Sequence, residues 1–181
     1  MSKILVVVGS GNIHGNTNAL ADAFIKGVHE VGGEVNKIVL NKTISGCQGC
    51  GACQRNGNQC AIQDEMQKYY SLYEEADQLV FASPLYFWSI SGRLKSFIDR
   101  LYALSTNDEY PYKETAFLMT SGSKGFYAFE QAVSFYRFFT NALGWKDQGM
   151  VLAGGCKGNP KFVDEKYLQE AYELGKKMGG K

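Results

Sequence analysis

The stretch at residues 9–17 constrains the fold of this chain more than any other, because it joins an apolar run to a helical pattern through one short loop. The apolar run at residues 4–8 predicts a buried strand, and an amphipathic helical pattern begins near Asn16. A strand, a tight loop and a helix N-terminus in succession gather unpaired backbone N–H groups and the positive end of the helix dipole at one point. Ser10, Asn16 and Thr17 add hydroxyl and amide groups there. The junction therefore predicts a binding site for a phosphate.

Two common nucleotide-binding motifs fit this loop poorly. The dinucleotide fingerprint G-x-G-x-x-G finds its first two glycines here but places His14 at the third, with Gly15 one position late. The next predicted strand ends at Leu40 and Asn41, so it offers no acidic residue for a ribose. A P-loop requires Gly-Lys-Ser/Thr where this chain has Gly-Asn-Thr. The remaining interpretation is a cradle of amides and hydroxyls suited to a phosphate monoester, and its alternative is an ordinary glycine-rich turn.

Strand and helix patterns alternate along the whole chain. Apolar runs predict strands at residues 4–8, 34–40, 78–82, 115–120 and 147–153, the third ended by Ser83 and Pro84. Apolar residues at helical spacing predict helices at residues 16–31, about 66–73, about 92–101, 126–143 and 164–178. Such alternation is typical of a parallel sheet with right-handed crossovers. We therefore expect residues 1–181 to form a single α/β domain, a flavodoxin-like three-layer sandwich with five parallel strands in the order 2-1-3-4-5 and helices on both faces.

Three loops follow the carboxyl ends of the first, third and fourth predicted strands, at residues 10–17, 83–91 and 120–125. We expect them to converge, because doubly wound sheets bind ligands at the carboxyl ends of strands near the switch point. The middle loop contains the consecutive aromatics Tyr86, Phe87 and Trp88. Such a loop supplies the apolar walls and backbone donors that a flat, redox-active heterocycle needs. The alternative is that these aromatics are core or interface residues, although three consecutive aromatics cannot all face one core.

These segments resemble the NAD(P)H-dependent FMN reductases of the flavodoxin-like superfamily. The similarity rests on Gly9-Ser10 with the Gly-Asn-Thr triplet at 15–17, on Ser-Pro-Leu-Tyr-Phe at 83–87 and on the helix pattern at 92–100. It implies that Ser10, Asn16 and Thr17 hold the phosphate of FMN. The residues that it implies around the isoalloxazine ring are Pro84, Leu85, Tyr86, Phe87 and Trp88 on one side and Ser121 and Gly122 on the other. Members often carry Arg at the cofactor-binding position where Asn12 stands, so backbone amides and His14 would neutralise the phosphate here.

Four cysteines lie close together in a glycine-rich loop after the second predicted strand. They form Cys-x-x-Cys-x-x-Cys and a fourth cysteine after six more residues, and they are Cys47, Cys50, Cys53 and Cys60. Compact spacing lets several thiolates meet one inorganic centre, and sulfur ligands favour iron–sulfur clusters or zinc. The pattern resembles that of the iron-sulfur flavoproteins of the same superfamily, which implies a [4Fe-4S] cluster near the flavin. Zinc, or free or oxidised thiols without metal, are the alternatives. We expect Cys156, which lies apart, to be a small buried residue.

Charge and hydropathy limit the partners. Nineteen basic and eighteen acidic residues give a net charge of +1, which argues against nucleic acid or an anionic membrane as a partner. The first apolar run is too short for a signal-peptide core or a membrane span, so we predict a cytoplasmic protein in a reducing compartment.

The predicted function is an FMN-dependent oxidoreductase. It would pass electrons from NAD(P)H through FMN to a small-molecule acceptor, such as a quinone or a flavin, or to a redox protein, with the cysteine loop as a further carrier where it holds a cluster. No catalytic general base is predicted, because the flavin itself accepts the hydride. The alternative is an iron-sulfur flavoprotein or flavodoxin-type electron carrier without nicotinamide turnover, and the balanced charge disfavours the flavodoxin type.

Two helices carry further predictions. The polar face of the helix at residues 92–101 carries three basic residues, Arg93, Lys95 and Arg100. We expect these side chains to be solvated, with a nicotinamide-nucleotide phosphate as the alternative partner.

The helix at residues 126–143 carries more aromatic residues than one buried stripe requires. We expect these aromatics to form a wall over the flavin or a partner surface, and hence a homodimer or homotetramer.

Overall fold

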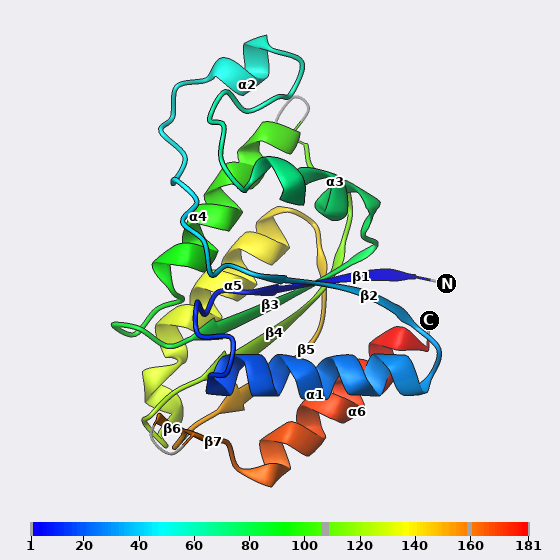
Figure 1. Cartoon of the computed structure of the whole chain (residues 1–181), viewed down its shortest axis with the longest axis vertical. Coiled ribbons are helices and arrows are strands. Elements are labelled where there is room, and N and C mark those ends of the chain that lie inside the picture. Colours follow the sequence, from blue (N-terminus) through cyan, green and yellow to red (C-terminus); the bar gives the residue numbers. More distant parts are fainter. Residues whose placement is uncertain (1, 106–108, 159–160, 181) are drawn as a thin grey trace.

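The structure is a computed structural model that describes residues 2–105, 109–158 and 161–180. Its main sheet has five parallel strands in the order β2-β1-β3-β4-β5, which confirms the predicted topology (Figure 1). The strands of this sheet are β1 (Lys3–Val8), β2 (Glu34–Val39), β3 (Gln78–Pro84), β4 (Glu114–Thr120) and β5 (Lys146–Ala153). The α-helices are α1 (Asn16–Glu30), α2 (Ala52–Arg55), α3 (Gln67–Glu75), α4 (Gly92–Arg100), α5 (Glu130–Ala142) and α6 (Glu165–Gly179).

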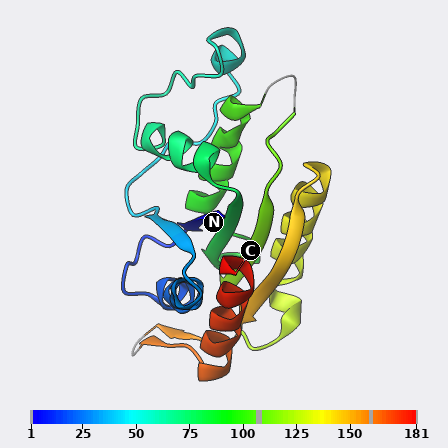
Figure 2. The same ribbon diagram turned by 90° about the vertical axis from the view of Figure 1, so that its right-hand side faces the viewer.

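Helices cover both faces of the sheet. Figures 1 and 2 show α1 and α6 together on one face, and α3, α4 and α5 on the other. Side chains alternate along a strand, so β1 sends Ile4, Val6 and Val8 into the core beneath α1 and α6. Leu5 and Val7 of the same strand enter the core beneath the other three helices. All residues of β3 are buried, as its consecutive apolar residues predicted.

Several boundaries differ from the sequence predictions. β3 continues through Ser83 and Pro84, which were expected to end it, because Pro84 is the last residue of the strand and opposes Thr120 without needing a further ladder donor. The predicted helix at residues 126–143 begins instead as the 3-10 turn η2 (Phe126–Ala128). The helix α2, the 3-10 turn η1 (Leu101–Leu104) and the hairpin of β6 (Lys157–Gly158) and β7 (Lys161–Phe162) were not predicted. They are too short to show a hydrophobic period.

Ser91 links the three elements that position the carboxyl edge of the sheet. Its Oγ donates to the carbonyl of Gly9 at 2.7 Å and accepts from the N–H of Leu94 at 3.1 Å, which caps α4. Its own N–H donates to Ser83 Oγ at 2.9 Å. One buried hydroxyl therefore fixes the end of β1 and the start of α4 relative to each other.

We expect Ser91→Ala to lower the free energy of unfolding by about 2 kcal/mol, because α4 loses its N-cap and the buried Gly9 carbonyl loses its donor. Equilibrium urea unfolding followed by circular dichroism measures this loss. Ser134→Ala is the matched control, since Ser134 is exposed on α5 and its replacement should change stability by less than about 0.5 kcal/mol. Equal stability of the two variants would contradict the prediction.

Candidate functional site

The three predicted loops meet around one cavity of about 340 Å³ at the carboxyl ends of β1, β3 and β4. Every residue predicted for the cofactor lines this cavity except Phe87 and Trp88. The lining residues are Ser10, Asn12, His14, Gly15, Asn16, Thr17, Pro84, Leu85, Tyr86, Thr120, Ser121, Gly122, Cys156 and Gly158. The predicted convergence of the three loops is therefore present, and Cys156 and Gly158, which lie outside these loops, were not predicted.

Asn12 stabilises the first loop from within. Its Oδ1 accepts from the N–H of His14 at 3.1 Å, and its carbonyl accepts from the N–H of Gly15 at 2.9 Å. The same carbonyl accepts from Nδ2 of Asn18 at 2.8 Å. Asn18 is buried, and its role in this loop was not predicted. The sequence does carry a signal for it, because Asn18 is a polar residue on the buried face of α1, one turn before Ala21. The Asn12 side chain is thus already engaged in holding the turn from which α1 starts.

The N-terminus of α1 opens into this cavity. Gly15 is the N-cap, and within the described residues no side chain caps the helix and no acidic residue occupies its first turn. Asn16 donates from Nδ2 to the carbonyl of Lys157 at 2.6 Å, while its Oδ1 is buried without a hydrogen-bond partner in the described part of the chain. The hydroxyls of Thr17 and Thr120 bond each other at 2.7 Å. Open backbone donors beside an orphaned amide oxygen fit a ligand that carries both a phosphate and hydroxyl groups.

His14 belongs to the loop at residues 9–17, and Arg93 of α4 packs against that loop. No Lys or Arg is among the described residues that line the cavity, and His14 is the histidine that lines it. Arg93 of α4 lies against Gly11, with its Cζ 3.4 Å from where a Cβ on that glycine would stand. Its Nη1 donates to the carbonyls of Leu40 and Lys42 at 3.0 and 3.2 Å. The Arg93 side chain is therefore exposed but hydrogen-bonded, and it connects the loop at residues 9–17 to the residues that follow β2.

The aromatic loop forms a tight hairpin. Tyr86 and Ser89 exchange both backbone hydrogen bonds at 3.0 and 3.1 Å, so Phe87 and Trp88 are the two central turn residues. Their φ angles are 47° and 59°, a left-handed conformation that bulky residues seldom adopt. Tyr86, Phe87 and Trp88 are 60%, 94% and 57% exposed, so the alternative that they belong to the core is wrong. Tyr86 faces the cavity, whereas the turn places the other two rings outside its lining.

This turn should be more stable with residues suited to positive φ. We expect the double change Phe87→Asn with Trp88→Gly to raise stability by about 1–2 kcal/mol, because Asn-Gly is the preferred sequence of a turn with both φ values positive and the exposed rings bury little area. Differential scanning calorimetry should show a melting temperature higher by about 2–8 °C. Tyr112→Asn removes an aromatic that is as exposed as Trp88, at 59% against 57%, and should give no gain. A double variant that melts at or below the wild-type temperature would contradict the prediction.

The loop after β4 forms the opposite wall. Ser121 accepts from Ser123 N–H at 3.0 Å through its Oγ and from Cys156 N–H at 2.9 Å through its carbonyl. Cys156 was expected to be a buried packing residue, but it is half-buried and lines the cavity. Its Sγ donates to the carbonyl of Ala153 at 3.3 Å, and burial raises the pKa of its thiol above the ordinary value. The thiol is therefore protonated at neutral pH and serves as part of the wall.

The four clustered cysteines line a second cavity, of about 280 Å³, together with Arg100 and Tyr102. Cys53 is buried, Cys60 is half-buried, and all four thiols are free of disulfides. Among the described residues, no three potential ligands already converge at metal-binding distance. Four soft sulfur donors line this one cavity, and their chemistry suits an iron–sulfur centre or zinc, which would bring them closer together than they are here.

The two cavities are separate. They share no lining residue, and Figure 1 shows α2 of the cysteine loop at the top of the molecule and α1 near the bottom. The expectation that the cysteine loop lies beside the first cavity is therefore not met within one chain. The reason is that residues 45–64 run along α3 and α4 instead of folding back over the end of β1.

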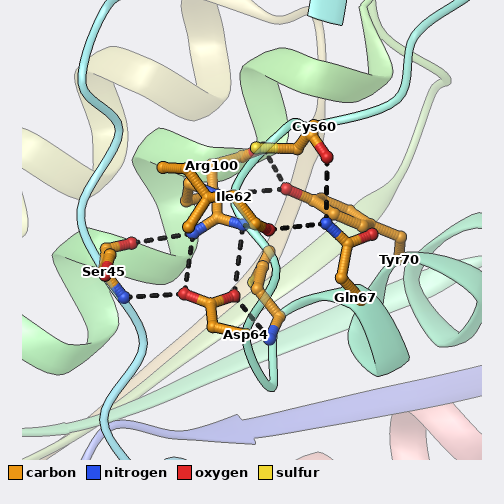
Figure 3. Close-up of polar contacts among 8 residues, drawn as sticks. Ser45, Cys60, Ile62, Asp64, Gln67, Tyr70 and Arg100 are labelled. Carbon is orange, nitrogen blue, oxygen red and sulfur yellow. Dashed lines mark hydrogen bonds and ion pairs between the residues drawn. The ribbon is translucent and has the colours of Figure 1, made fainter.

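The prediction that the Arg100 side chain is solvated is wrong. The sequence placed it on the solvated face of its helix, but it is 1% exposed and forms a two-point ion pair with Asp64 (Figure 3). Its Nη1 and Nη2 lie 3.0 and 3.2 Å from the two carboxylate oxygens. Burial opposes ionisation of Asp64, but the hydrogen bonds from Arg100 and from the backbone N–H groups of Ser45 and Met66 outweigh it and lower the pKa of Asp64. The stabilisation is therefore present above the ordinary pKa of 3.8 and is lost as the pH falls through the lower, folded-state value.

Comparison with known proteins adds to this geometry. A family model described as NADPH-dependent FMN reductase matches residues 2–148. The iron-sulfur flavoprotein of Archaeoglobus fulgidus is 30% identical over 181 residues, covering 97% of this chain and 78% of its own. The FMN-dependent NADH:quinone oxidoreductase 1 of Mesoplasma florum is 25% identical and covers 88% of both chains. The structure of an FMN-dependent NADH-azoreductase from Bacillus anthracis in complex with FMN has the same fold, with a TM-score of 0.70 at 16% identity over 99% of this chain and 98% of that one.

Proposed function

Because the chain belongs to the NADPH-dependent FMN reductase family, we propose that the cavity at the carboxyl ends of β1, β3 and β4 holds FMN. The protein then passes electrons from NAD(P)H to a small acceptor such as a quinone. The observation that carries this proposal is the open N-terminus of α1, which faces the loops after β3 and β4 across one cavity. A phosphate and a flat ring joined by a polyol chain match these three surfaces.

The residues have separate tasks in this proposal. Ser10 and Thr17, with the first backbone N–H groups of α1, hold the phosphate, and the orphaned Oδ1 of Asn16 accepts from a ligand hydroxyl. The ring-facing residues are Pro84, Leu85 and Tyr86 on one side and Ser121 and Gly122 on the other. Bound FMN supplies the chemistry of hydride acceptance and electron donation. The chain positions and shields the reacting groups, and no side chain is assigned as a general base.

The overall reaction balances as a two-electron transfer. NAD(P)H gives up a hydride and becomes NAD(P)⁺, and a quinone takes two electrons and two protons, one of them from solvent. We expect FMN-loaded protein to oxidise NADH or NADPH in a steady-state assay with a quinone, ferricyanide or free flavin as acceptor. The proposed activity is wrong if neither nucleotide is oxidised with any of these acceptors.

A binding experiment tests the site itself. The double change Asn16→Ala with Thr17→Ala should raise the dissociation constant of FMN at least about tenfold, because hydrogen bonds to the ligand are lost and each contributes about 1 kcal/mol. Asn36→Ala is the control, since Asn36 is exposed on β2 and away from the cavity. Unchanged FMN affinity in the double variant would reject this assignment of the phosphate site.

A second candidate function has its own observation, the four cysteines that line one cavity. We propose that Cys47, Cys50, Cys53 and Cys60 bind a [4Fe-4S] cluster, which would make the protein an iron-sulfur flavoprotein, an electron carrier without nicotinamide turnover. The name of the relative from Archaeoglobus fulgidus supports this proposal. Protein purified without oxygen should show a broad absorbance beside the flavin bands and equal amounts of iron and sulfide. Zinc alone, or no metal, would exclude the cluster.

We also propose that the chain forms a homodimer or homotetramer. Large aromatic side chains are exposed on η2 and α5, among them Tyr127 of η2 and Phe138 of α5 at 66% and 78%. Light scattering should give a multiple of the 20.0 kDa chain mass, and a monomer would contradict the proposed oligomer.

The described helices include none with the length and apolar character needed to cross a membrane. The four closely spaced free thiols support a location in the reducing cytoplasm.

A further inference from the structure

One buried side chain, Arg100 of α4, contacts both ends of the cysteine loop. Its Nη1 donates to the carbonyl of Ser45 at 3.0 Å, just before the first cysteine. Its Nη2 donates to the carbonyl of Ile62 at 3.2 Å, just after the last. Figure 3 shows the guanidinium between these two carbonyls. The loop is therefore closed at its base by one planar group attached to the rigid part of the fold.

Asp64 fixes the orientation of that group. Its two oxygens receive Nη1 and Nη2 of Arg100 in parallel, which is the geometry that an arginine fork matches best. The same carboxylate accepts from the N–H of Ser45 at 2.9 Å and of Met66 at 3.1 Å. Arg100 and Asp64 are 1% and 15% exposed at their side chains, so solvent weakens the pair little. The ion pair thus holds the start of the loop through Asp64 as well as through Arg100.

The helix α3 extends the network to the fourth cysteine. Gln67 donates from Nε2 to the carbonyls of Cys60 at 3.0 Å and Ile62 at 2.7 Å. Tyr70 accepts from Nε of Arg100 at 3.2 Å and its hydroxyl also bonds the side chain of Cys60. Figure 3 shows this sequence of contacts from the guanidinium through the phenol to the sulfur. Both the backbone and the thiol of Cys60 are therefore positioned by side chains of the network.

We propose that Arg100 is a positioning residue of the cysteine cavity. It holds the cysteine loop closed before any metal binds, and it provides a fixed positive charge for an anionic, thiolate-ligated cluster. Arg100 is the one cationic side chain among the described residues that line this cavity. Arg55, whose Nη2 donates to the carbonyl of Cys50 at 3.2 Å, is exposed and stays unchanged in every variant below. The first part depends only on the contacts above, and the second part rests on the cluster proposed under the second candidate function.

Each part has a measurable consequence. A loop held by an ion pair keeps its closed form when metal is absent, unlike small metal domains whose ordering depends on the metal. A positive charge beside a cluster stabilises its reduced form, which carries one more negative charge, and so raises the reduction potential. Removing that charge should lower the potential of the loaded fraction, which a role in folding alone would not do.

Two variants separate geometry from charge. Arg100→Lys keeps the charge but lacks the planar fork, while the pair Arg100→Gln with Asp64→Asn removes both charges and leaves neither partner buried alone. Lys95→Gln is the matched control, because Lys95 is exposed on the same helix and pairs with Asp99 at the surface. Circular dichroism and FMN affinity report whether the rest of each variant is folded, since the cavities share no lining residue.

Hydrogen exchange in chelator-treated, metal-free protein tests the first part. Peptides covering residues 45–64 should exchange at least about tenfold faster in both network variants, at the wild-type rate in Lys95→Gln, and equally in wild type before and after chelation. Wild-type exchange rates in both network variants would overturn the proposal. So would a wild-type loop that becomes freely exchanging as soon as metal is removed.

Redox titration of reconstituted protein tests the second part. Arg100 lines the cavity and its partner Asp64 does not, so the cation of the ion pair is the charge that faces the cluster. The double variant, which removes both charges, should therefore show a cluster potential below that of wild type, whereas Arg100→Lys and Lys95→Gln should remain close to it. Equal potentials in wild type and the double variant would reject the electrostatic role. A wild-type protein that takes up no iron would reject the cluster, and with it this second part, while the exchange experiment still decides the first.

Discussion

Replacing Gly27 or Gly175 by alanine will destabilise the protein by about 3 kcal/mol or more, even though alanine is the better helix former. A Cβ on Gly27 would stand 2.0 Å from the carbonyl oxygen of Tyr172, and one on Gly175 would stand 2.0 Å from that of Phe24. Both obstacles are backbone atoms, so the clash is relieved only if α1 and α6 move apart. The helix propensity gained is about 1 kcal/mol, which is smaller than the cost of separating two packed helices above the sheet.

The matched control is Gly92→Ala on α4, where an added Cβ meets no atom within 4 Å. The same substitution should there be neutral or stabilise by up to about 1 kcal/mol. Thermal and urea unfolding of the three variants measure the difference, and the two destabilised variants should melt about 6–12 °C lower. If Gly27→Ala is as stable as Gly92→Ala, α1 and α6 do not make the close contact described above.

The second prediction concerns the charge of the proposed phosphate site. Gly15→Asp should weaken FMN binding at least about a hundredfold, because it places a carboxylate at the N-terminus of α1 where the phosphate belongs. Two unit charges 4 Å apart repel by about 4 kcal/mol at an effective dielectric constant of 20, and salt reduces this only in part. The Asp side chain would also cap the helix and occupy its free N–H groups. This cap should offset the crowding of the new Cβ against the carbonyl of Asn12, so the folded protein should lose little stability.

Gly15→Ser separates charge from shape. A Cβ at this position stands 3.0 Å from the carbonyl of Asn12, so both substitutions meet the same crowding, and both residues are good N-caps. Fluorescence titrations should show that Gly15→Asp binds FMN far more weakly than Gly15→Ser does. Riboflavin, which lacks the phosphate, should discriminate little between them. Equal FMN affinities would show that the phosphate does not bind at this helix end.

Sequence patterns were sufficient to predict the main strands and the loops that meet at one edge of the sheet. The alternation of apolar runs and amphipathic patterns predicted the five strands and the helices between them, because burial and helical periodicity are local properties. The order of the strands was then expected from the doubly wound fold that such alternation is typical of. The glycine-rich stretch at residues 9–17 and the Pro84–Tyr86 segment were found because parallel strands place their following loops at one edge. Boundaries at Pro84 and Phe126 were missed by a few residues, since hydrogen bonding across the sheet extends or shortens an element.

Other features depended on contacts between distant segments. Arg100 has the spacing of a solvated helix residue, and only the approach of Asp64, 36 residues away, makes it the buried centre of a network. Phe87 and Trp88 have a composition typical of a ligand wall, yet a turn with positive φ at both residues directs them outward.

The sequence by itself determined the fold type with its sheet order, the family and the candidate residues, because alternating local patterns and motif spacing are typical of one known kind of fold. The tertiary structure alone decided which charges are buried and how closely α1 meets α6. It also decided that the cysteine cavity is separate from the cavity at the strand ends. These properties depend on the packing of segments far apart in the chain, which no local pattern encodes.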